Sequence, residues 1–537
     1  GATLNLKENS HLYFRTNGLL RASVKNSGEF KMHGSNPAVF GDNEYFKIYY
    51  DGSCNIENTH STSNFFIASA FGMQLRVNTS EAALAAIANG RVSLFYDNNE
   101  KFQTTTTGAK VLGALEVTQE YPTIRPTLNL NFAATKTLER RITFKRDGLA
   151  TFTGDDGLVK YASSNVPRFD HDPVTRESLG LLIEESRTNN NKVTNLERDG
   201  MNSNGWTLAR LHAPEHYISE TSPDGLNNST LIAPDTQNNS HYAYVAWPGD
   251  TLTGARTVSC WFKNLSTTIY YPQLRIIGSG NGVAHANYTL SGNGTINSGG
   301  SDLTGATITP YPNGWYRCTL SWNTTSTHYG GGIVVSNSAS SELPGFAGDA
   351  DNTKGFLAWG YQDEAGSYAT SLIPTNGSAV TRGQDIAKIT GTNFTDFYNQ
   401  TEGTLVAHYY STVDDGYLAQ LENSATPGDD RIGFVNYSAY QGYVETGNSS
   451  QASIDNGTPT VGGVNRVAFA FKANDFAVSL NSATPTADTS GTMPTVDRMM
   501  IGSRSGGAYD VLKSTIRHLS YYPKRLPNAQ LQGLTQQ

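Results

Sequence analysis

The sequence predicts an all-β protein, with an N-terminal stalk of short β repeats followed by two β-sandwich domains. The chain of 537 residues contains 53 Gly, 28 Tyr and 22 Phe, whereas only 16% of its residues are charged. Such usage favours short strands and tight turns over long helices, which prefer Ala, Leu, Glu and Lys. At about 100–200 residues per domain, the length allows three or four domains, each with its own core.

Residues 1–120 consist of short apolar segments, each closed by a polar turn, as in 12–18 (LYFRTNG) and 46–52 (FKIYYDG). Residues 81–88 contain good helix formers, but Asn89 and Gly90 follow so closely that a helix of two turns would be marginal. Because each strand has few apolar side chains, one chain cannot form a thick core. We therefore expect identical chains to wind around a shared axis as an elongated homotrimeric stalk, with a small monomeric β domain as the alternative.

The end of this region matches a motif of known viral proteins. Residues 88–113 (ANGRVSLFYDNNEKFQTTTTGAKVLG) resemble a repeat found in the tail fibres of tailed bacteriophages. The resemblance covers about 25 residues and implies a structural protein of a phage virion, assembled in the host cytoplasm together with other virion proteins. It does not by itself identify a receptor.

Residues 121–195 are expected to form a connector that packs on the sandwich following it. Residues 165–170 (NVPRFD) and 180–189 (GLLIEESRTN) resemble signatures that precede lectin-like β-sandwiches in phage structural proteins. The apolar residues within 181–183 would not remain in solvent, so we expect this connector to be packed rather than extended.

Residues 196–385 have the pattern of a β-sandwich or jelly roll, with strands of five to eight residues between Gly, Asn and Ser turns. We expect strands at 257–262, 273–277, 315–322 and 331–335. Residues 359–375 (WGYQDEAGSYATSLIPT) and 381–385 (TRGQD) resemble the last strand and the tail of phage carbohydrate-binding modules. That resemblance implies a glycan ligand.

A second sandwich is predicted for residues 401–537, after a linker at 386–400. Residues 467–471 and 476–480 alternate between an apolar face and a small or polar face. The order of its segments resembles the laminin-G and concanavalin-A-like sandwich, and we expect 528–534 to form a short terminal helix.

Charge and hydropathy exclude several classes of protein. The net charge of −8 and the absence of a basic run argue against a nucleic-acid binder. No apolar stretch approaches the ~20 residues of a membrane span, and no signal sequence opens the chain, so we expect no membrane insertion. Because the chain begins at Gly1 without Met, we expect it to be processed or part of a longer polypeptide. Cys260 and Cys318 fall on apolar faces of predicted strands, which favours free core thiols over a disulfide bridge.

The sequence contains no metalloprotease, nucleophile-elbow or phosphate-loop motif. Adjacent carboxylates occur at 155–156, 184–185, 363–364, 414–415 and 429–430. Glycosidases use two carboxyl groups about 5–10 Å apart across a cleft, so adjacency in sequence is no evidence for them. We interpret most of these residues as solvated turns and predict no catalytic residue and no enzymatic activity.

The segment around Asp349 and Asp351 has closely spaced oxygen ligands, like half of a calcium loop. It lacks the central Gly and the distant bidentate Glu of an EF-hand, so a plain polar turn is favoured. A structural calcium ion here is the one cofactor that the sequence leaves open.

Protein sites for glycans place flat aromatic rings against the apolar faces of sugars, beside polar side chains that bind hydroxyl groups. Rings near predicted turns are therefore candidate ligands of a glycan, with burial in a core or a trimer contact as the alternative for each. The candidates are Trp206, Tyr242, Tyr244 and Trp247 in the first sandwich and Tyr437, Tyr440 and Tyr443 in the second.

The features together favour an adhesion protein, a phage tail fibre whose sandwiches bind glycans on the host cell surface. A purely structural role, as a head fibre, decoration or tail-assembly protein, is the first alternative. A polysaccharide depolymerase is a weaker alternative, because the sequence shows no sustained repeat of the kind that builds a long β-helix.

Overall fold

The computed structural model describes residues 11–33, 38–40, 46–50, 54–58, 69–77, 80–106, 108–112, 124–194, 196, 198–212, 215–217, 220–246, 254–265, 270–278, 284–324, 328–411, 416–436, 440–504 and 511–536. The chain forms two compact units, Gly1–Val117 and Thr118–Gln537. The paired strands of the described residues are antiparallel and their helices are at most two turns long, so the protein is all-β as predicted. None of these helices is long and apolar enough to span a membrane.

The N-terminal unit (Gly1–Val117) contains three thin sheets. Their strands are β1 (Leu12–Thr16), β2 (Leu19–Val24) and β3 (Phe30–Met32); β4 (Ala38–Phe40), β5 (Phe46–Tyr50) and β6 (Cys54–Asn58); and β7 (Gly72–Val77), β8 (Glu81–Ile87), β9 (Val92–Tyr96), β10 (Asn99–Thr105) and β11 (Gly108–Val111). Residues 81–88, whose composition suggested a marginal helix, supply β8, because hydrogen bonds to β7 and β9 satisfy its backbone on both edges.

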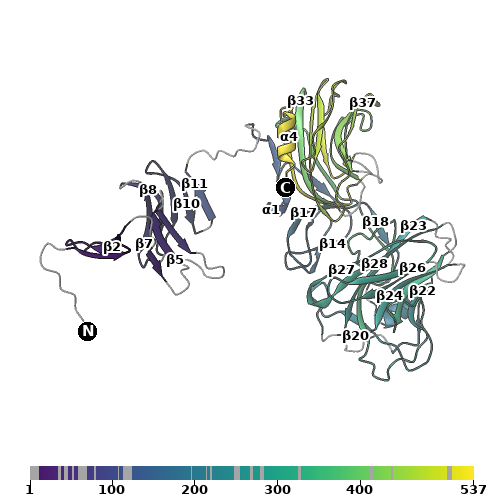
Figure 1. Cartoon of the computed structure of the whole chain (residues 1–537). Helices are drawn as coiled ribbons and strands as arrows, with labels where there is room; N and C mark the ends of the chain where they lie inside the picture. Colours follow the sequence, from purple (N-terminus) through teal and green to yellow (C-terminus); the bar gives the residue numbers. More distant parts are fainter. Residues whose placement is uncertain are drawn as a thin grey trace. The chain divides into compact units, whose positions relative to one another are not determined.

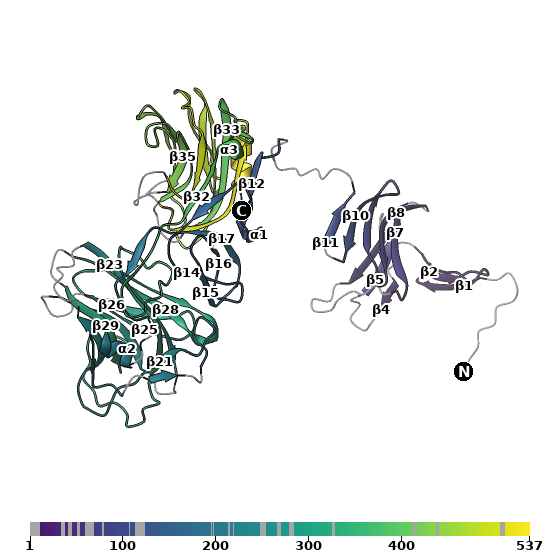
Figure 2. The same cartoon turned by 180° about the vertical axis from the view of Figure 1, so that it is seen from behind.

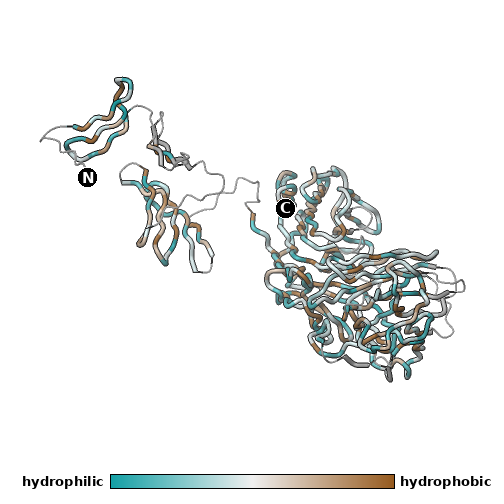
Figure 3. Tube along the Cα trace, turned by 60° about the horizontal axis from the view of Figure 1, so that its bottom comes forward, coloured by the Kyte–Doolittle hydropathy of each residue, from teal (hydrophilic) through white to brown (hydrophobic). Residues whose placement is uncertain are grey.

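Apolar and polar residues both occur along most strands of this unit (Figure 3), whereas β8 is a run of Ala, Leu and Ile after Glu81. Among its described residues, Ala22 is the one hydrophobic residue that is buried, whereas large apolar side chains such as Phe30, Leu75 and Tyr96 are exposed. The sheets therefore have apolar surface but no core within a single chain.

The C-terminal unit (Thr118–Gln537) contains two sandwiches, which can be followed in Figures 1 and 2. The first, here called the outer sandwich, has an eight-stranded and a seven-stranded sheet. The eight strands are β12 (Leu128–Leu130), β16 (Phe169–His171), β17 (Ser178–Ile183), β33 (Glu402–Ser411), β38 (Gly463–Lys472), β39 (Phe476–Leu480), β40 (Thr486–Asp488) and β42 (Ser514–Tyr522). The seven are β13 (Thr143–Lys145), β32 (Ile386–Thr390), β34 (Gly416–Glu422), β35 (Arg431–Asn436), β36 (Tyr440–Thr446), β37 (Ser449–Asp455) and β41 (Arg498–Ile501).

Residues expected to form a connector and a linker are strands of this outer sandwich. β12 and β17 pair with β42, and β13 pairs with β32. Leu181, Ile183 and Ile389 are buried in the same hydrophobic core as Phe469, which explains why these short segments join the sheets. The terminal helix α4 (Asn528–Leu534) lies where the sequence predicts it.

The second sandwich, here called the inserted sandwich, lies between β17 and β32 in the sequence. One six-stranded sheet contains β19 (Trp206–Ala209), β22 (His241–Ala246), β29 (His328–Ser336), β24 (Tyr271–Gly278), β25 (Ala284–Thr289) and β26 (Thr295–Gly299). The other contains β20 (Glu215–Tyr217), β21 (Ser229–Ile232), β30 (Phe356–Ala365), β23 (Gly254–Asn264), β28 (Tyr316–Thr324) and β27 (Leu303–Pro310). The four strands predicted here are confirmed, and Cys260 and Cys318 are free, buried and opposite each other on β23 and β28.

Several short elements complete the C-terminal unit. They are the hairpin of β14 (Ala150–Thr153) and β15 (Val159–Ala162), the pair β18 (Arg187–Asn189) and β31 (Val380–Arg382), the helices α1 (Phe132–Thr135), α2 (Arg198–Ser203) and α3 (Thr392–Thr395), and the 3-10 helix η1 (Pro312–Gly314). β18 and β31 are where the chain leaves and rejoins the outer sandwich.

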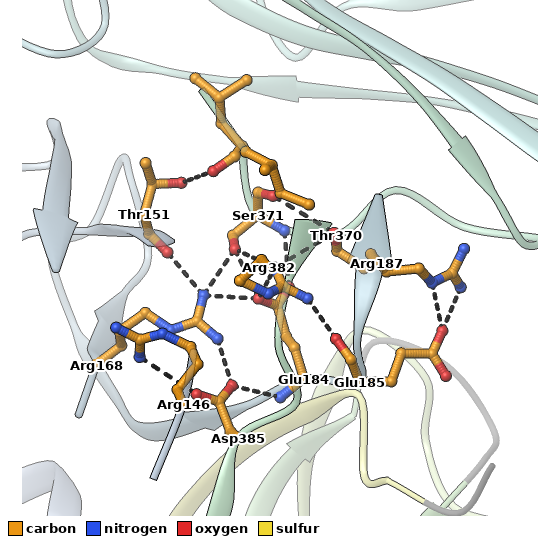
Figure 4. A network of polar contacts seen from close by, with 12 residues as sticks. Arg146, Thr151, Arg168, Glu184, Glu185, Arg187, Thr370, Ser371, Arg382 and Asp385 are labelled. Carbon is orange, nitrogen blue, oxygen red and sulfur yellow. Dashed lines mark hydrogen bonds and ion pairs between the residues drawn. The ribbon is translucent and has the colours of Figure 1, made fainter. Parts of the chain in front are cut away.

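A buried polar cluster at this crossing, here called the junction network, joins five charged side chains (Figure 4). Its members are Arg146, Arg168, Glu184, Arg382 and Asp385, and Ser371 bonds to it from the segment after β30. Arg168 donates to Glu184 Oε2 at 2.7 Å and to Asp385 Oδ2 at 2.5 Å, and Arg382 donates to the same Glu184 oxygen at 2.7 Å. Buried charges of this kind need paired partners.

Candidate functional site

The outer face of the sheet that contains β22 and β24 carries a row of polar and aromatic residues at matched register. Tyr244 on β22 lies opposite Gly332 on β29, which in turn lies opposite Arg275 on β24. Arg275 lies opposite His285 on β25. Because alternate residues of a strand point to the same face, Tyr242 lies on this face as well, beside Tyr244.

The glycines of β29 make room for a flat tyrosine ring. A Cβ atom at Gly330 would collide with the ring and hydroxyl group of Tyr244, and one at Gly332 would collide with the backbone of β22. The Tyr244 ring therefore lies directly over the backbone of β29. Tyr242 and Tyr244 are both half-buried, so part of each ring faces solvent.

These side chains line a cavity of about 300 Å³, here called the tyrosine groove. Its lining residues are Tyr242, Ala243, Tyr244, Arg275, Gly332, Val334 and Leu343. The volume lies at the lower end of the range of small-molecule sites, about 300–1,000 Å³. Burial raises the pKa of Tyr244, with a smaller contribution from Tyr242, so its hydroxyl group stays protonated and can donate a hydrogen bond.

The segment after β29 crosses this face and fixes its polar side chains. The carbonyl of Ser341 accepts hydrogen bonds from Gln273 Nε2 at 2.9 Å and from Asn287 Nδ2 at 3.0 Å. Glu342 pairs with Arg275 at 2.9 Å. The segment that contributes Leu343 to the tyrosine groove is thus fixed to the sheet by these contacts.

Within the described part of this face, three buried polar atoms lack a hydrogen-bond partner. They are Gln273 Oε1, Arg275 Nε and His285 Nδ1, and each of these residues is at least nine-tenths buried. An unpaired buried polar atom costs about 1–3 kcal/mol. Burial also lowers the pKa of His285, which keeps its imidazole neutral near pH 7. Of these three residues, Arg275 lines the tyrosine groove, whereas Gln273 and His285 lie on the same face of the sheet outside the residues that line it. The Arg275 guanidinium is therefore the donor nearest to a polar ligand in the groove.

The other sequence candidates fall elsewhere. Trp206 belongs to the core of the inserted sandwich and donates to Asn191 Oδ1 at 3.3 Å. Tyr443 is also buried, on the seven-stranded sheet, where its hydroxyl group donates to Gln420 Oε1 and its ring packs edge-on against Tyr417. The structure thus brings Tyr242 and Tyr244 together on one face, whereas Trp206 and Tyr443 are buried by packing within their own sandwiches.

Three further candidates are only partly covered by the described residues. Trp247 and Tyr437 lie outside them, and Tyr440 is placed only by its backbone, opposite Asn436 in the pairing of β36 with β35. Their part in ligand binding stays a prediction.

The segment proposed as a calcium loop contains its own cation. Lys354 Nζ lies 2.7 Å from Asp349 Oδ2, and Thr353 donates to Asp351 Oδ1 at 2.6 Å. Both contacts lower the pKa of the aspartates. The described residues contain no group of three or more His, Cys, Asp or Glu side chains that could hold a metal ion. A calcium ion would have to displace Lys354.

Three carboxylates interpreted as solvated turn residues are buried instead. Glu184 belongs to the junction network, Asp363 makes a bidentate pair with Arg256 at 2.7 and 2.6 Å, and Glu364 accepts a hydrogen bond from the backbone of Thr370. Each sits in a strand or next to one. Arginines from distant segments compensate the charges of Glu184 and Asp363, whereas Glu364 is bonded by the nearby Thr370.

Sequence reasoning also missed Arg275 and the glycines of β29 as parts of the tyrosine groove. The run of glycines at 330–332 was the available signal, since Gly within a strand often marks the close approach of another group.

No protein-family model matches the chain, and no curated protein matches it. Among solved structures, similarity is found to the CBM40 domain of the Ruminococcus gnavus IT-sialidase bound to α2,3-sialyllactose, with 15% identity over 26% of this chain and 84% of that chain and a TM-score of 0.24. Domains LG4-5 of the mouse laminin α1 chain match at 10% identity over 56% of this chain and 92% of theirs, with a TM-score of 0.19. The Trypanosoma rangeli sialidase matches at 12% identity over 62% and 63%, with a TM-score of 0.22. The similarity to these proteins is distant, and TM-scores this low carry no argument about function.

Proposed function

We propose that this protein is a glycan-binding component of a bacteriophage tail fibre and that the tyrosine groove binds a saccharide of the host cell surface. The observation that carries the proposal is the pair of half-exposed rings, Tyr242 and Tyr244, which line the groove together with Arg275. The Nε atom of Arg275, and Gln273 Oε1 on the same face of the sheet, are buried without a hydrogen-bond partner. Apolar ring surface next to unsatisfied donors and acceptors matches the two chemical faces of a sugar.

Binding rather than catalysis fits this site. Among the described residues, those that line the tyrosine groove include no carboxylate, and Glu342, which bonds to this lining, is paired with Arg275. Glycoside hydrolysis uses two carboxyl groups across a cleft. We therefore expect no turnover, and a constant viscosity of host polysaccharide during incubation with the protein would agree with this.

The second part of the proposal is that the N-terminal unit associates as a homotrimer in the virion. Its described residues bury a single hydrophobic side chain, while Phe30, Leu75 and Tyr96 are 62%, 52% and 75% exposed. Thin sheets with this much exposed apolar surface gain stability when identical chains cover it. Three copies would also multiply weak binding sites without new contacts.

Titration of the full-length protein with purified host-surface polysaccharide tests the binding site. Tyr244→Ala removes the flat ring and should weaken binding at least about tenfold, whereas Tyr244→Phe keeps the ring and should retain most of the affinity. Tyr161→Ala removes an exposed tyrosine from β15, outside the groove, and serves as the control. Equal binding by Tyr244→Ala and the control would show that saccharide does not bind in the groove.

Sedimentation equilibrium of the full-length chain tests the association. We expect three copies per particle, and a truncated chain of residues 118–537, whose sandwiches have their own cores, should be monomeric. A monomeric full-length chain would contradict the proposed stalk.

Labelling of the C-terminal unit in images of the virion distinguishes a free receptor-binding tip from a purely structural position.

A further inference from the structure

A second and larger cavity lies between the two sandwiches. It has a volume of about 640 Å³ and is here called the junction cavity. One wall is the outer face of β27 and β28 of the inserted sandwich, and the other includes Tyr410, Val461 and Lys513 of the outer sandwich. The tyrosine groove lies on the opposite sheet of the inserted sandwich, so the two cavities are separate.

The lining of the junction cavity combines hydroxyl groups with aromatic rings. Thr307, Thr309 and Thr319 point into it from neighbouring strands, and Tyr311, Tyr368 and Tyr410 line it as well. Clefts between domains with few charged groups and several rings are common places for ligands to bind. A volume of 640 Å³ exceeds that of the tyrosine groove about twofold, so it can hold a longer ligand.

Two cations line this cavity. The Arg317 guanidinium lies 4.6 Å from the centre of the Trp261 ring, and its Nε atom is buried without a hydrogen-bond partner. The Lys513 ammonium lies 5.6 Å from the centre of the Tyr368 ring and 3.7 Å from Glu185. Arg317 Nη2 also donates a hydrogen bond to the carbonyl oxygen of Thr370 at 2.5 Å, a neutral partner that does not cancel the guanidinium charge. The Lys513 ammonium, in contrast, shares its charge with Glu185.

The two carboxyl groups of the lining offer little competing negative charge. Glu184 is held by Arg168 and Arg382. Asp170 accepts a hydrogen bond from the backbone of Thr153 at 2.6 Å, and burial raises its pKa to about 6. Glu185, beside Lys513, is itself paired with Arg187, so below that pH positive charge dominates the potential inside the cavity.

We propose that the junction cavity is a second binding site, selective for an acidic oligosaccharide, in which Arg317 and Lys513 bind the acid groups and Tyr311 and Tyr410 contact the sugar rings. A ligand bound there contacts both sandwiches at once. This site does not depend on ligand binding in the tyrosine groove.

Isothermal titration of the full-length protein, at a pH below 6, with tetragalacturonate and with a heparin tetrasaccharide tests the proposal. The fully methyl-esterified tetragalacturonate is the matched neutral ligand. We expect at least one acidic ligand to bind and the ester to bind at least about tenfold more weakly, as the loss of a charge-assisted hydrogen bond predicts. If neither acidic ligand binds, or if the ester binds equally well, the proposal is overturned.

Two tryptophan substitutions on β27 locate the site. Thr309→Trp fills the cavity and should lower the affinity at least about tenfold, whereas Thr304→Trp alters an exposed threonine of the same strand outside the lining and should not. Arg317→Gln should also weaken binding, and Tyr244→Ala, in the tyrosine groove, should leave it unchanged. Equal binding by the two tryptophan variants, or loss of binding in Tyr244→Ala, would place the ligand elsewhere.

Discussion

Replacing Arg168 by methionine removes the cation at the centre of the junction network and tests what that network contributes to stability. The guanidinium is fully buried and contacts Glu184 and Asp385. Removing one partner of a buried ion pair costs about 3–5 kcal/mol, because the other charge stays in the interior uncompensated. Here Glu184 keeps Arg382 and Asp385 keeps Arg146. We therefore expect the free energy of unfolding to fall by about 3 kcal/mol, the lower end of that range.

Urea unfolding of the full-length protein, followed by tryptophan fluorescence, measures this loss. All six Trp residues lie within 206–359, so the signal reports the inserted sandwich and its attachment, not the N-terminal unit. Lys160→Met is the matched control, since Lys160 pairs with Asp156 at 2.6 Å but the two side chains are 39% and 44% exposed. Exposed pairs contribute at most about 1 kcal/mol. A loss in Arg168→Met no greater than in the control would refute the reasoning.

Three further predictions concern pH and packing. Burial alone would raise the pKa of Glu184, but Arg382 and Arg168 hold it at about 2. The charge of Glu184 therefore stabilises the fold above pH 4.5, and this contribution is lost as the pH falls towards 2. Glu184→Gln should make the decrease of Tm at acid pH less steep than in the wild type. Burial raises the pKa of Asp170 from 3.8 to about 6, so the stability that its protonated form contributes is present below pH 3.8 and is lost as the pH rises through 6. Asp170→Asn should therefore have a free energy of unfolding up to about 3 kcal/mol higher than wild type above pH 6, and the same as wild type below pH 3.8. Urea unfolding at both pH values measures the difference. Gly332→Ala places a Cβ atom against the backbone of β22, so it should lower the free energy of unfolding in urea by about 1–3 kcal/mol and also weaken saccharide binding. Unchanged stability and binding would contradict the close packing of this sheet.

The period-two pattern of the sequence predicted individual strands well, because a strand with one buried face shows it locally. It gave residues 476–480 the bounds that the structure has for β39. The terminal helix expected at 528–534 has the bounds of α4 as well. It could not show which strands pair. Leu128 lies opposite Tyr521, nearly four hundred residues away, and alternation defines a face but not a partner. The sequence therefore predicts a connector at 121–195, whereas the structure shows that this segment contributes strands to the outer sandwich.

The same limit applies to the candidate site. Tyr242 and Tyr244 could be identified as candidates because aromatic residues at alternate positions are visible in one segment. The glycines at 330–332 indicate a close approach without showing by which group, and nothing in its own segment singles out Arg275. The register of three strands places these residues in one row. The carboxylate of Glu184 was misinterpreted for a similar reason: its compensating partners, Arg168 and Arg382, come from both sides of the inserted sandwich.

The way the tyrosine groove is built bears on how tightly one copy can bind. Its polar side chains are held by Ser341 and Glu342, so a ligand meets groups that are already ordered, and little side-chain entropy is lost on binding. The aromatic contact of one groove is nevertheless small, because it comes from two half-buried rings. On the proposed function, strong attachment then requires several grooves that act together. If three grooves engage one surface, a variant that weakens each groove tenfold weakens the attachment by up to about a thousandfold. Loss of cell attachment should therefore be much steeper than loss of single-site affinity, and equal losses would mean that each groove binds alone.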